Sequence, residues 1–437
     1  MAREQDFWKK LDKAFDNDEI LAGERGDKLY CEREHSPEED MKDLFDTTLD
    51  QASPPVAFFS GHRGSGKSSL LARLLQHCHS NYFVVYYDIE YNLEKDKANQ
   101  IDLLYLLGAA IHKIGDEAGV KPDPNNLKAL HDSIYTLTDT FKEKPKDESF
   151  DIVELLKNLV VFGAGMVGSP VGAKLAEALL KPFKITSGVS EETAKSHTIE
   201  PQVQNIVNNV NLIIADVQAK AKKPLLVIVD GLDKINDETQ AKLIFLKSRS
   251  LRGPRCRLIY TVPMMIQSMP EFLPIEEECK SYTLPNVKLF SRLDITHTHT
   301  AGYDTLREVV RTRLETVPIA AGDLFENDVV EYLILKSGGV MRWFISLVRD
   351  ACALSRRRSL DKVDMTVAKQ VVASRVADLT GKLTIERKTI LQSVHENKAT
   401  SDNPLCYMLL QSLFILAYRN DETWFDAHPL LWDYIKV

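Results

Sequence analysis

Residues 61–68, GHRGSGKS, have the types and the spacing of a phosphate-binding loop. They fit the pattern G-x-x-x-x-G-K-[ST] at every fixed position, after an apolar run and before a helical one. Glycines let the backbone approach a phosphate closely, so that successive N–H groups cradle it at the positive end of the helix. The lysine then reaches the β- and γ-phosphates, and the last hydroxyl completes a Mg²⁺ shell. The predicted phosphate-binding residues are Gly61, His62, Arg63, Gly64, Ser65, Gly66, Lys67, Ser68 and Ser69.

A second, independent pattern places acids after a buried strand. Residues 225–229 are all apolar and lead into Asp230, which predicts a strand ending in a carboxylate. Ligands bind at the carboxyl ends of such strands, so we expect Asp230 to serve the Mg²⁺ together with Ser68. Asp233 follows three residues later and is the candidate that orients or activates an attacking water. The structural alternatives are a helix cap for Asp230 and a plain turn aspartate for Asp233.

Together, SGHRGSGKSS and LLVIVDGLDKI resemble the ASCE P-loop NTPases, and more narrowly the bacterial AAA+ and STAND-type ATPases. The resemblance implies ATP and Mg²⁺ as cofactors and ATP hydrolysis to ADP and phosphate as the activity. Typical AAA+ proteins carry a glutamate directly after the strand aspartate, whereas this chain has Gly231. The resemblance therefore assigns the water-orienting role to Asp233 and implies a slow switch rather than a motor.

Two further residues match the resemblance. Thr261 lies near the end of a predicted strand and resembles the polar sensor 1 residue, which contacts the γ-phosphate or the water. Arg342, in SGGVMR, resembles the sensor 2 arginine of initiator-like AAA+ proteins. The alternatives are an ordinary buried threonine and a surface arginine.

The stretch from Lys247 to Arg257 carries five cations in eleven residues. In AAA+ rings this position often supplies an arginine finger, a cation that neutralises transition-state charge at the neighbour's ATP. Arg249 and Arg252 are the candidates. A solvated basic loop and a nucleic-acid contact are the alternatives.

The elements that must position these residues alternate between strands and helices, which predicts an α/β parallel sheet flanked by helices. The expected strands cover residues 56–60, 82–87 (followed by Asp88), 225–230, 258–263 and 282–284. Helices are expected at 101–118 and 202–222, and beyond 289 at 303–317, 327–337 and 340–355. Three helices at 366–379, 384–397 and 404–410, then a hairpin at 414–426 turning near Asn420-Asp421, predict a winged helix.

Length and composition set the outer limits. The 437 residues exceed one ordinary domain, and 44% hydrophobic with 27% charged residues exclude a disordered or collagen-like chain. We expect a helical lead-in (1–50), a P-loop ATPase domain (51–290, with 119–200 as an insertion of unclear role), a helical lid (291–358) and a winged-helix-like domain (359–437). The six cysteines form no CxxC pair, which favours a reducing cytoplasm. The stretch at 158–173 is too short and glycine-rich for a membrane span.

The net charge of −8 argues against a dedicated nucleic-acid coat protein. Residues 361–437 hold nine Lys/Arg against ten Asp/Glu, so the winged helix is expected to pack, oligomerise or inhibit rather than grip DNA. The leading hypothesis is an ATP-dependent switch that controls homo-oligomerisation or a protein partner; the resemblance adds phage defence as a setting. A DNA-loading or transposition-regulator ATPase and a non-hydrolysing nucleotide-binding scaffold are the alternatives.

Overall fold

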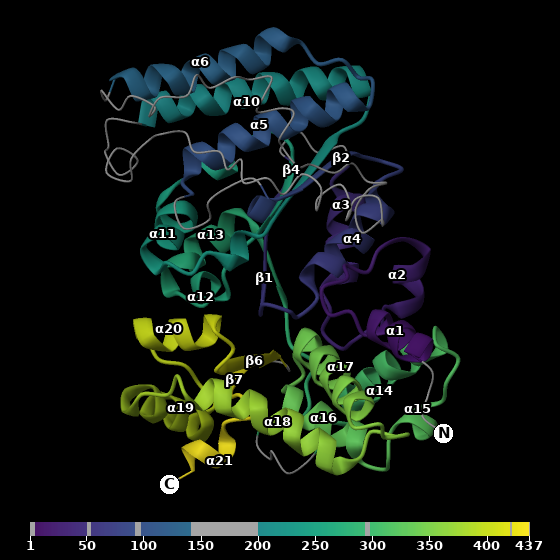
Figure 1. The fold of residues 1–437 in the computed structure, drawn as a ribbon. Coiled ribbons are helices and arrows are strands. Elements are labelled where there is room, and N and C mark those ends of the chain that lie inside the picture. The colour runs from purple at the N-terminus through teal and green to yellow at the C-terminus, as the bar shows by residue number, and fades with distance from the viewer. Residues whose placement is uncertain are drawn as a thin grey trace. The chain divides into compact units, whose positions relative to one another are not determined.

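The computed structural model describes residues 5–49, 54–91, 98–140, 200–292, 298–419 and 422–436. The chain divides into two compact units (Figure 1). The first comprises Met1–Pro37, Gly61–Leu70 and Thr283–Val437, and the second Glu38–Ser60 and Leu71–Tyr282. The chain thus enters and leaves each unit more than once. The glycine-rich stretch at 158–173 and the turn at Asn420-Asp421, both singled out from the sequence, lie outside the described residues.

The sheet consists of five strands in the order β2-β3-β4-β1-β5. Neighbouring strands β2 and β3, β3 and β4, and β4 and β1 pair in parallel. Residues of β1, β3 and β4 are buried throughout, because both faces of a parallel sheet are covered. The predicted α/β fold is confirmed, with strands at β1 Val56–Gly61, β2 Phe83–Asp88, β3 Leu225–Asp230, β4 Arg257–Thr261 and β5 Lys280–Leu284.

Long helices α5, α6 and α10 lie side by side in the second unit (Figure 1). Most of α5 is buried, since it packs against both of the others as well as β2. Asn99 caps the start of α5 by accepting hydrogen bonds from the N–H groups of Ile101 and Asp102. Helices with residues in this unit are α3 Glu38–Thr47, α4 Lys67–Cys78, α5 Gln100–Glu117, α6 Pro124–Thr140, α10 Glu200–Ala221, α11 Glu238–Lys242, α12 Met264–Gln267 and α13 Leu273–Glu278.

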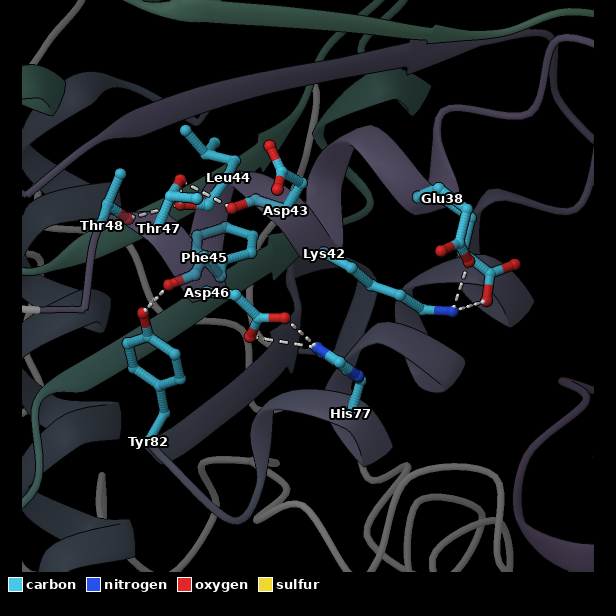
Figure 2. Close-up of polar contacts among 11 residues, drawn as sticks. Glu38, Lys42, Asp43, Leu44, Phe45, Asp46, Thr47, Thr48, His77 and Tyr82 are labelled. Carbon is cyan, nitrogen blue, oxygen red and sulfur yellow. Dashed lines mark hydrogen bonds and ion pairs between the residues drawn. The ribbon is translucent and has the colours of Figure 1, made fainter.

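Helix α3 contacts its neighbours in the second unit at both of its ends, and Figure 2 shows the contacts of His77 and Tyr82 near its C-terminal end. At its start, Glu38 accepts from Lys42 at 2.9 Å, and Arg73 of α4 donates to Glu38 at 3.0 Å. Near its end, His77 Nε2 lies 2.9 Å from Asp46 Oδ2, and the Tyr82 hydroxyl donates to the Phe45 carbonyl at 2.6 Å. Helix α3 therefore belongs to the second unit, whose first segment begins at Glu38.

The first unit is mainly helical. Its last three long helices precede an antiparallel pair, β6 and β7, which is the winged-helix outline predicted from the sequence. Leu416 and Tyr418 of β6 and Trp424 of β7 form a buried cluster with Val340. Its elements are α1 Gln5–Ala14, α2 Gly23–Leu29, α14 Thr300–Glu315, α15 Ala321–Leu324, α16 Val329–Ser337, α17 Met341–Arg357, α18 Met365–Thr380, α19 Ile385–Asn397, α20 Pro404–Gln411, β6 Ile415–Arg419, β7 Thr423–Ala427 and α21 Trp432–Ile435.

In the part of the chain that the structure describes, no helix combines the length and the apolar character needed to cross a membrane.

Candidate nucleotide-binding site

The glycine-rich loop runs from the end of β1 at Gly61 to the start of α4 at Lys67. The Lys67 ammonium is buried and donates to the loop's own carbonyl groups, at 2.9 Å to Gly61 and 3.0 Å to His62. Ser68 occupies the first turn of α4, where free N–H groups and the helix dipole favour an anion. This is the strand–loop–helix context that the sequence pattern requires of a phosphate-binding loop.

Arg342, the proposed sensor 2 residue, lies directly against this loop in the first unit. Its backbone N–H donates to the Gly64 carbonyl at 3.0 Å, and its guanidinium lies 3.7 Å from Asp18. Gly64 has a φ of +80°, and a Cβ built on it would lie only 2.6 Å from the Arg342 Cβ. Glycine is therefore required here both by the backbone conformation and by the close approach of α17.

His62 connects the same loop to the winged-helix-like segment. Its Nε2 accepts a hydrogen bond from the Ala417 N–H of β6 at 2.8 Å, and the side chain is 2% exposed. Burial, with a smaller contribution from Lys67, lowers the pKa of His62 to about 3. Burial also lowers the pKa of His428 to about 3, with His62 adding to the effect. Both imidazoles are neutral at physiological pH, which leaves His62 able to accept.

Two residues of the N-terminal segment make contacts that were not predicted. Arg33 donates to the Ser65 carbonyl at 2.6 Å and to the Pro285 carbonyl at 3.4 Å. The Leu21 N–H donates to the Ser69 hydroxyl at 3.0 Å. No local spacing signals these contacts, because each joins residues more than thirty positions apart. The side chain of Arg63, in the same loop, is exposed.

In the second unit, Asp230 ends β3 as expected and is 1% exposed. The Tyr86 hydroxyl donates to its Oδ2 at 2.9 Å, and the Gly231 N–H donates to its Oδ1 at 2.7 Å. These donors fix the orientation of the carboxylate. Asp230 also pairs in register with Asp88, the last residue of β2, so two carboxylates sit at neighbouring strand ends.

Asp88 belongs to a small charged cluster that sequence reasoning missed. Its Oδ1 accepts from the Glu90 N–H at 2.8 Å, and Lys234 lies 3.4 Å from its Oδ2 and 2.6 Å from Glu90 Oε2. Burial raises the pKa of Asp88 to about 7; Lys234 opposes the rise and Asp230 adds to it. The only sequence signal was the acid closing the second β-rich run.

Thr261, the proposed sensor 1 residue, and Asp233, the proposed water-orienting residue, also lie in the second unit. Thr261 is the last residue of β4, and its buried hydroxyl accepts from the Leu232 N–H at 3.1 Å and donates to the Val229 carbonyl at 3.4 Å. Thr261 thus braces the turn that follows Asp230. Asp233 lies in that turn, the 3₁₀ segment Leu232–Lys234, and is buried.

Two of the five cations in the basic stretch form hydrogen bonds or ion pairs, and the other three are exposed. Arg257 is buried and donates to the carbonyl groups of Thr48 and Leu49, so it anchors β4 to the end of α3. Arg252 forms an ion pair with Glu278. Arg249 is exposed, as are Lys247 and Arg255. Counting cations in the sequence cannot make this distinction, because the partners come from distant segments.

Remote similarities extend along the whole chain. The chain resembles a chain in the structure of Drosophila ORC bound to DNA, with 10% sequence identity and a TM-score of 0.41, over 100% of this chain and 93% of that one. It also resembles the Aeropyrum pernix ORC1 protein in complex with DNA, with 12% identity and a TM-score of 0.40, over 95% and 96% of the two chains. No curated protein matches it.

A family model supplies the more direct comparison. The model described as an AAA ATPase domain matches residues 37–259, just over half of the 437 residues. The match begins next to α3 and includes the glycine-rich loop, Asp230 and the turn that holds Asp233. The chain belongs to the AAA ATPase domain family.

Proposed function

We propose that this protein is an ATP-binding and ATP-hydrolysing molecular switch whose nucleotide state controls its association with copies of itself or with a protein partner. One observation carries the proposal: segments far apart in the sequence converge on the phosphate-binding loop within the first unit. Arg33, Arg342 and Ala417 each donate a hydrogen bond to a loop residue. A change in the loop on nucleotide binding would therefore alter hydrogen bonds to the N-terminal segment, the lid and the winged helix at the same time.

The predicted phosphate-binding and metal-binding residues keep their roles in this proposal. The loop from Gly61 to Ser69 binds the phosphates, with Lys67 as the point charge on the β- and γ-phosphates. Ser68 and Asp230 are the proposed ligands of Mg²⁺. Their hydroxyl and carboxylate oxygens are the hard donors that this ion prefers, and the hydrogen bonds that orient Asp230 fit a ligand held in one position. When bound, Mg²⁺ would offset the negative charge of the phosphates.

The chemistry proposed is in-line attack of water on the γ-phosphate, giving ADP and phosphate. Thr261 and Arg342 would respond to the presence or loss of the γ-phosphate. Turnover is expected to be slow, because Gly231 stands where typical AAA+ proteins have a glutamate. A slow hydrolysis step fits a switch that stays in its ATP-bound state until hydrolysis returns it to the ADP-bound state; a motor needs rapid turnover.

A DNA-loading ATPase is the second candidate. It is favoured by three exposed cations in the basic stretch, Lys247, Arg249 and Arg255, which are available to phosphates. Arg249 is also the better of the two proposed arginine fingers, because Arg252 already pairs with Glu278. The non-hydrolysing scaffold, the STAND assignment and a setting in phage defence stay predictions from the resemblance.

One experiment separates these functions. The mass of the particle is measured without nucleotide, with ADP and with a non-hydrolysable ATP analogue, each with and without duplex DNA. A switch predicts a nucleotide-dependent mass that DNA leaves unchanged. A DNA-loading ATPase predicts an ATP-dependent, salt-sensitive complex with DNA, weakened by charge removal at Arg249 and Arg255. A mass that never responds to nucleotide would contradict the switch.

A further inference from the structure

A guanidinium from the N-terminal segment contacts the phosphate-binding loop. Nη2 of Arg33 donates to the Ser65 carbonyl at 2.6 Å, and its Nη1 donates to the Pro285 carbonyl, just after β5, at 3.4 Å. The next loop residue is also close, because a Cβ built on Gly66 would lie 3.1 Å from the same Nη2. All of these residues belong to the first unit, so the contacts lie within one compact body.

Within the part of the chain that the structure describes, the charge of Arg33 is not balanced by a carboxylate. Its two acceptors are neutral backbone carbonyls. Burial lowers the pKa of Arg33, and the guanidinium still carries its charge at physiological pH. A cation withdrawn from water is costly unless an anion and hydrogen bonds compensate it. A nucleotide phosphate held by the neighbouring loop would supply that anion.

The contact also fixes one peptide group of the loop. The peptide between Ser65 and Gly66 is planar, and in the trans form its C=O and N–H point in opposite directions. Because Arg33 holds the carbonyl, the Gly66 N–H points away from Arg33. A charged donor on the carbonyl polarises the peptide as well, which makes its N–H a stronger donor. Inward-pointing N–H groups are what such a loop offers to a phosphate.

We propose that Arg33 is a positioning residue of the phosphate-binding loop, which orients and polarises the Ser65–Gly66 peptide so that the Gly66 N–H donates to a phosphate of the bound nucleotide. This inference rests on the nucleotide binding proposed above. Arg33 acts through Gly66 and does not itself touch the nucleotide. Its second hydrogen bond, to Pro285, keeps the guanidinium in place while the loop is empty. The N-terminal segment therefore contributes to nucleotide affinity.

The test compares three substitutions in the full-length protein. Arg33→Gln keeps a neutral donor but removes the charge, whereas Arg33→Lys keeps a charged donor. Arg25→Gln is the matched control, since it breaks only the partly exposed pair of another N-terminal arginine with Glu19. For each protein, calorimetry gives Kd for Mg²⁺ with a non-hydrolysable ATP analogue, and Tm without nucleotide reports folding.

A second measurement observes the Gly66 amide itself, which a merely structural arginine would not affect. Cell-free synthesis with ¹³C-carbonyl serine and ¹⁵N-glycine selects the four Ser-Gly peptides of the sequence by NMR. The Gly66 signal is the one that is lost in Ser65→Ala. In the intact protein its proton should move downfield when the nucleotide analogue is added, as expected for an N–H that begins to donate to a charged oxygen.

The proposal predicts that Arg33→Gln raises Kd about tenfold and reduces the nucleotide-induced shift of Gly66. Arg33→Lys should recover most of both effects, and Arg25→Gln should match the intact protein. An unchanged Kd in Arg33→Gln, a raised Kd with the full Gly66 shift, or no recovery in Arg33→Lys at an unchanged Tm would each overturn the assignment. If the intact protein gives no heat with the nucleotide analogue, nucleotide binding itself fails, which is a different result.

Discussion

The hydrogen bond between Ala417 and His62 predicts that the contact between the winged helix and the phosphate-binding loop depends on pH. His62 accepts only in its neutral form, and its pKa is lowered from 6.5 to about 3 in the folded chain. Opening the contact exposes the imidazole and restores its ordinary pKa. The opened state therefore binds the extra proton below pH 6.5, so the closed contact is at full strength above pH 6.5 and weakens as the pH falls toward 3.

The size of the effect follows from the two pKa values. Each pH unit below 6.5 costs the closed state about 1.4 kcal/mol, which amounts to about 2 kcal/mol at pH 5. If the same opening also exposes His428, whose pKa is lowered equally, the loss doubles to about 4 kcal/mol. Replacing His62 by alanine would instead leave the Ala417 N–H without its acceptor at every pH, at about 1–3 kcal/mol.

The assay is native-state hydrogen exchange of the Ala417 amide, corrected for the intrinsic exchange rate, between pH 7.5 and pH 5. His62→Gln supplies an amide oxygen that can accept but does not titrate, so it should remove about 2 kcal/mol of the pH dependence. His79→Gln, which alters an exposed histidine, is the control. An opening free energy with the same pH dependence in the intact protein and in His62→Gln would refute the reasoning.

Two further predictions concern the glycine after Asp230 and the N-terminal arginine. Gly231→Ala should destabilise the protein by at least about 1 kcal/mol more than Gly119→Ala in urea unfolding; both positions have positive φ, but only at Gly231 does the new Cβ meet Asp88. Equal losses would show that Asp88 does not occupy that space. Arg33→Ala removes donors to Ser65 and Pro285 and should weaken Mg·ATP binding about tenfold by calorimetry. Arg25→Ala, which breaks only the partly exposed pair with Glu19, should leave affinity nearly unchanged, and a similar Kd for both variants would argue against a role for Arg33.

The buried strands were the part of the fold that the sequence predicted best. The apolar run ending in Asp230 matches β3 residue for residue, because a strand covered on both faces needs apolar side chains at consecutive positions. The two strands of the winged-helix hairpin were predicted to within a residue or two of their observed bounds. Their signal is two runs of aromatic and aliphatic residues separated by polar residues in the sequence. Both signals are local, so a single sequence carries them.

The contacts around the loop could not be predicted in the same way. Arg33 and Ala417 reach the loop through tertiary packing, and nothing near them in the sequence marks their partners. Gly231 is a further example: the sequence shows that the glutamate implied by the resemblance is absent, whereas the positive φ and the neighbouring Asp88 carboxylate, which a Cβ would overlap, are visible only in the structure.

Calorimetric titration with Mg·ATP shows whether the glycine-rich loop binds a magnesium–triphosphate. The intact protein should release or absorb heat with a one-to-one stoichiometry. Lys67→Ala should abolish that binding, because the ammonium that now donates to the Gly61 and His62 carbonyls is the only lysine in the loop sequence. The absence of any heat with the intact protein, or an undiminished affinity in Lys67→Ala, would contradict the account.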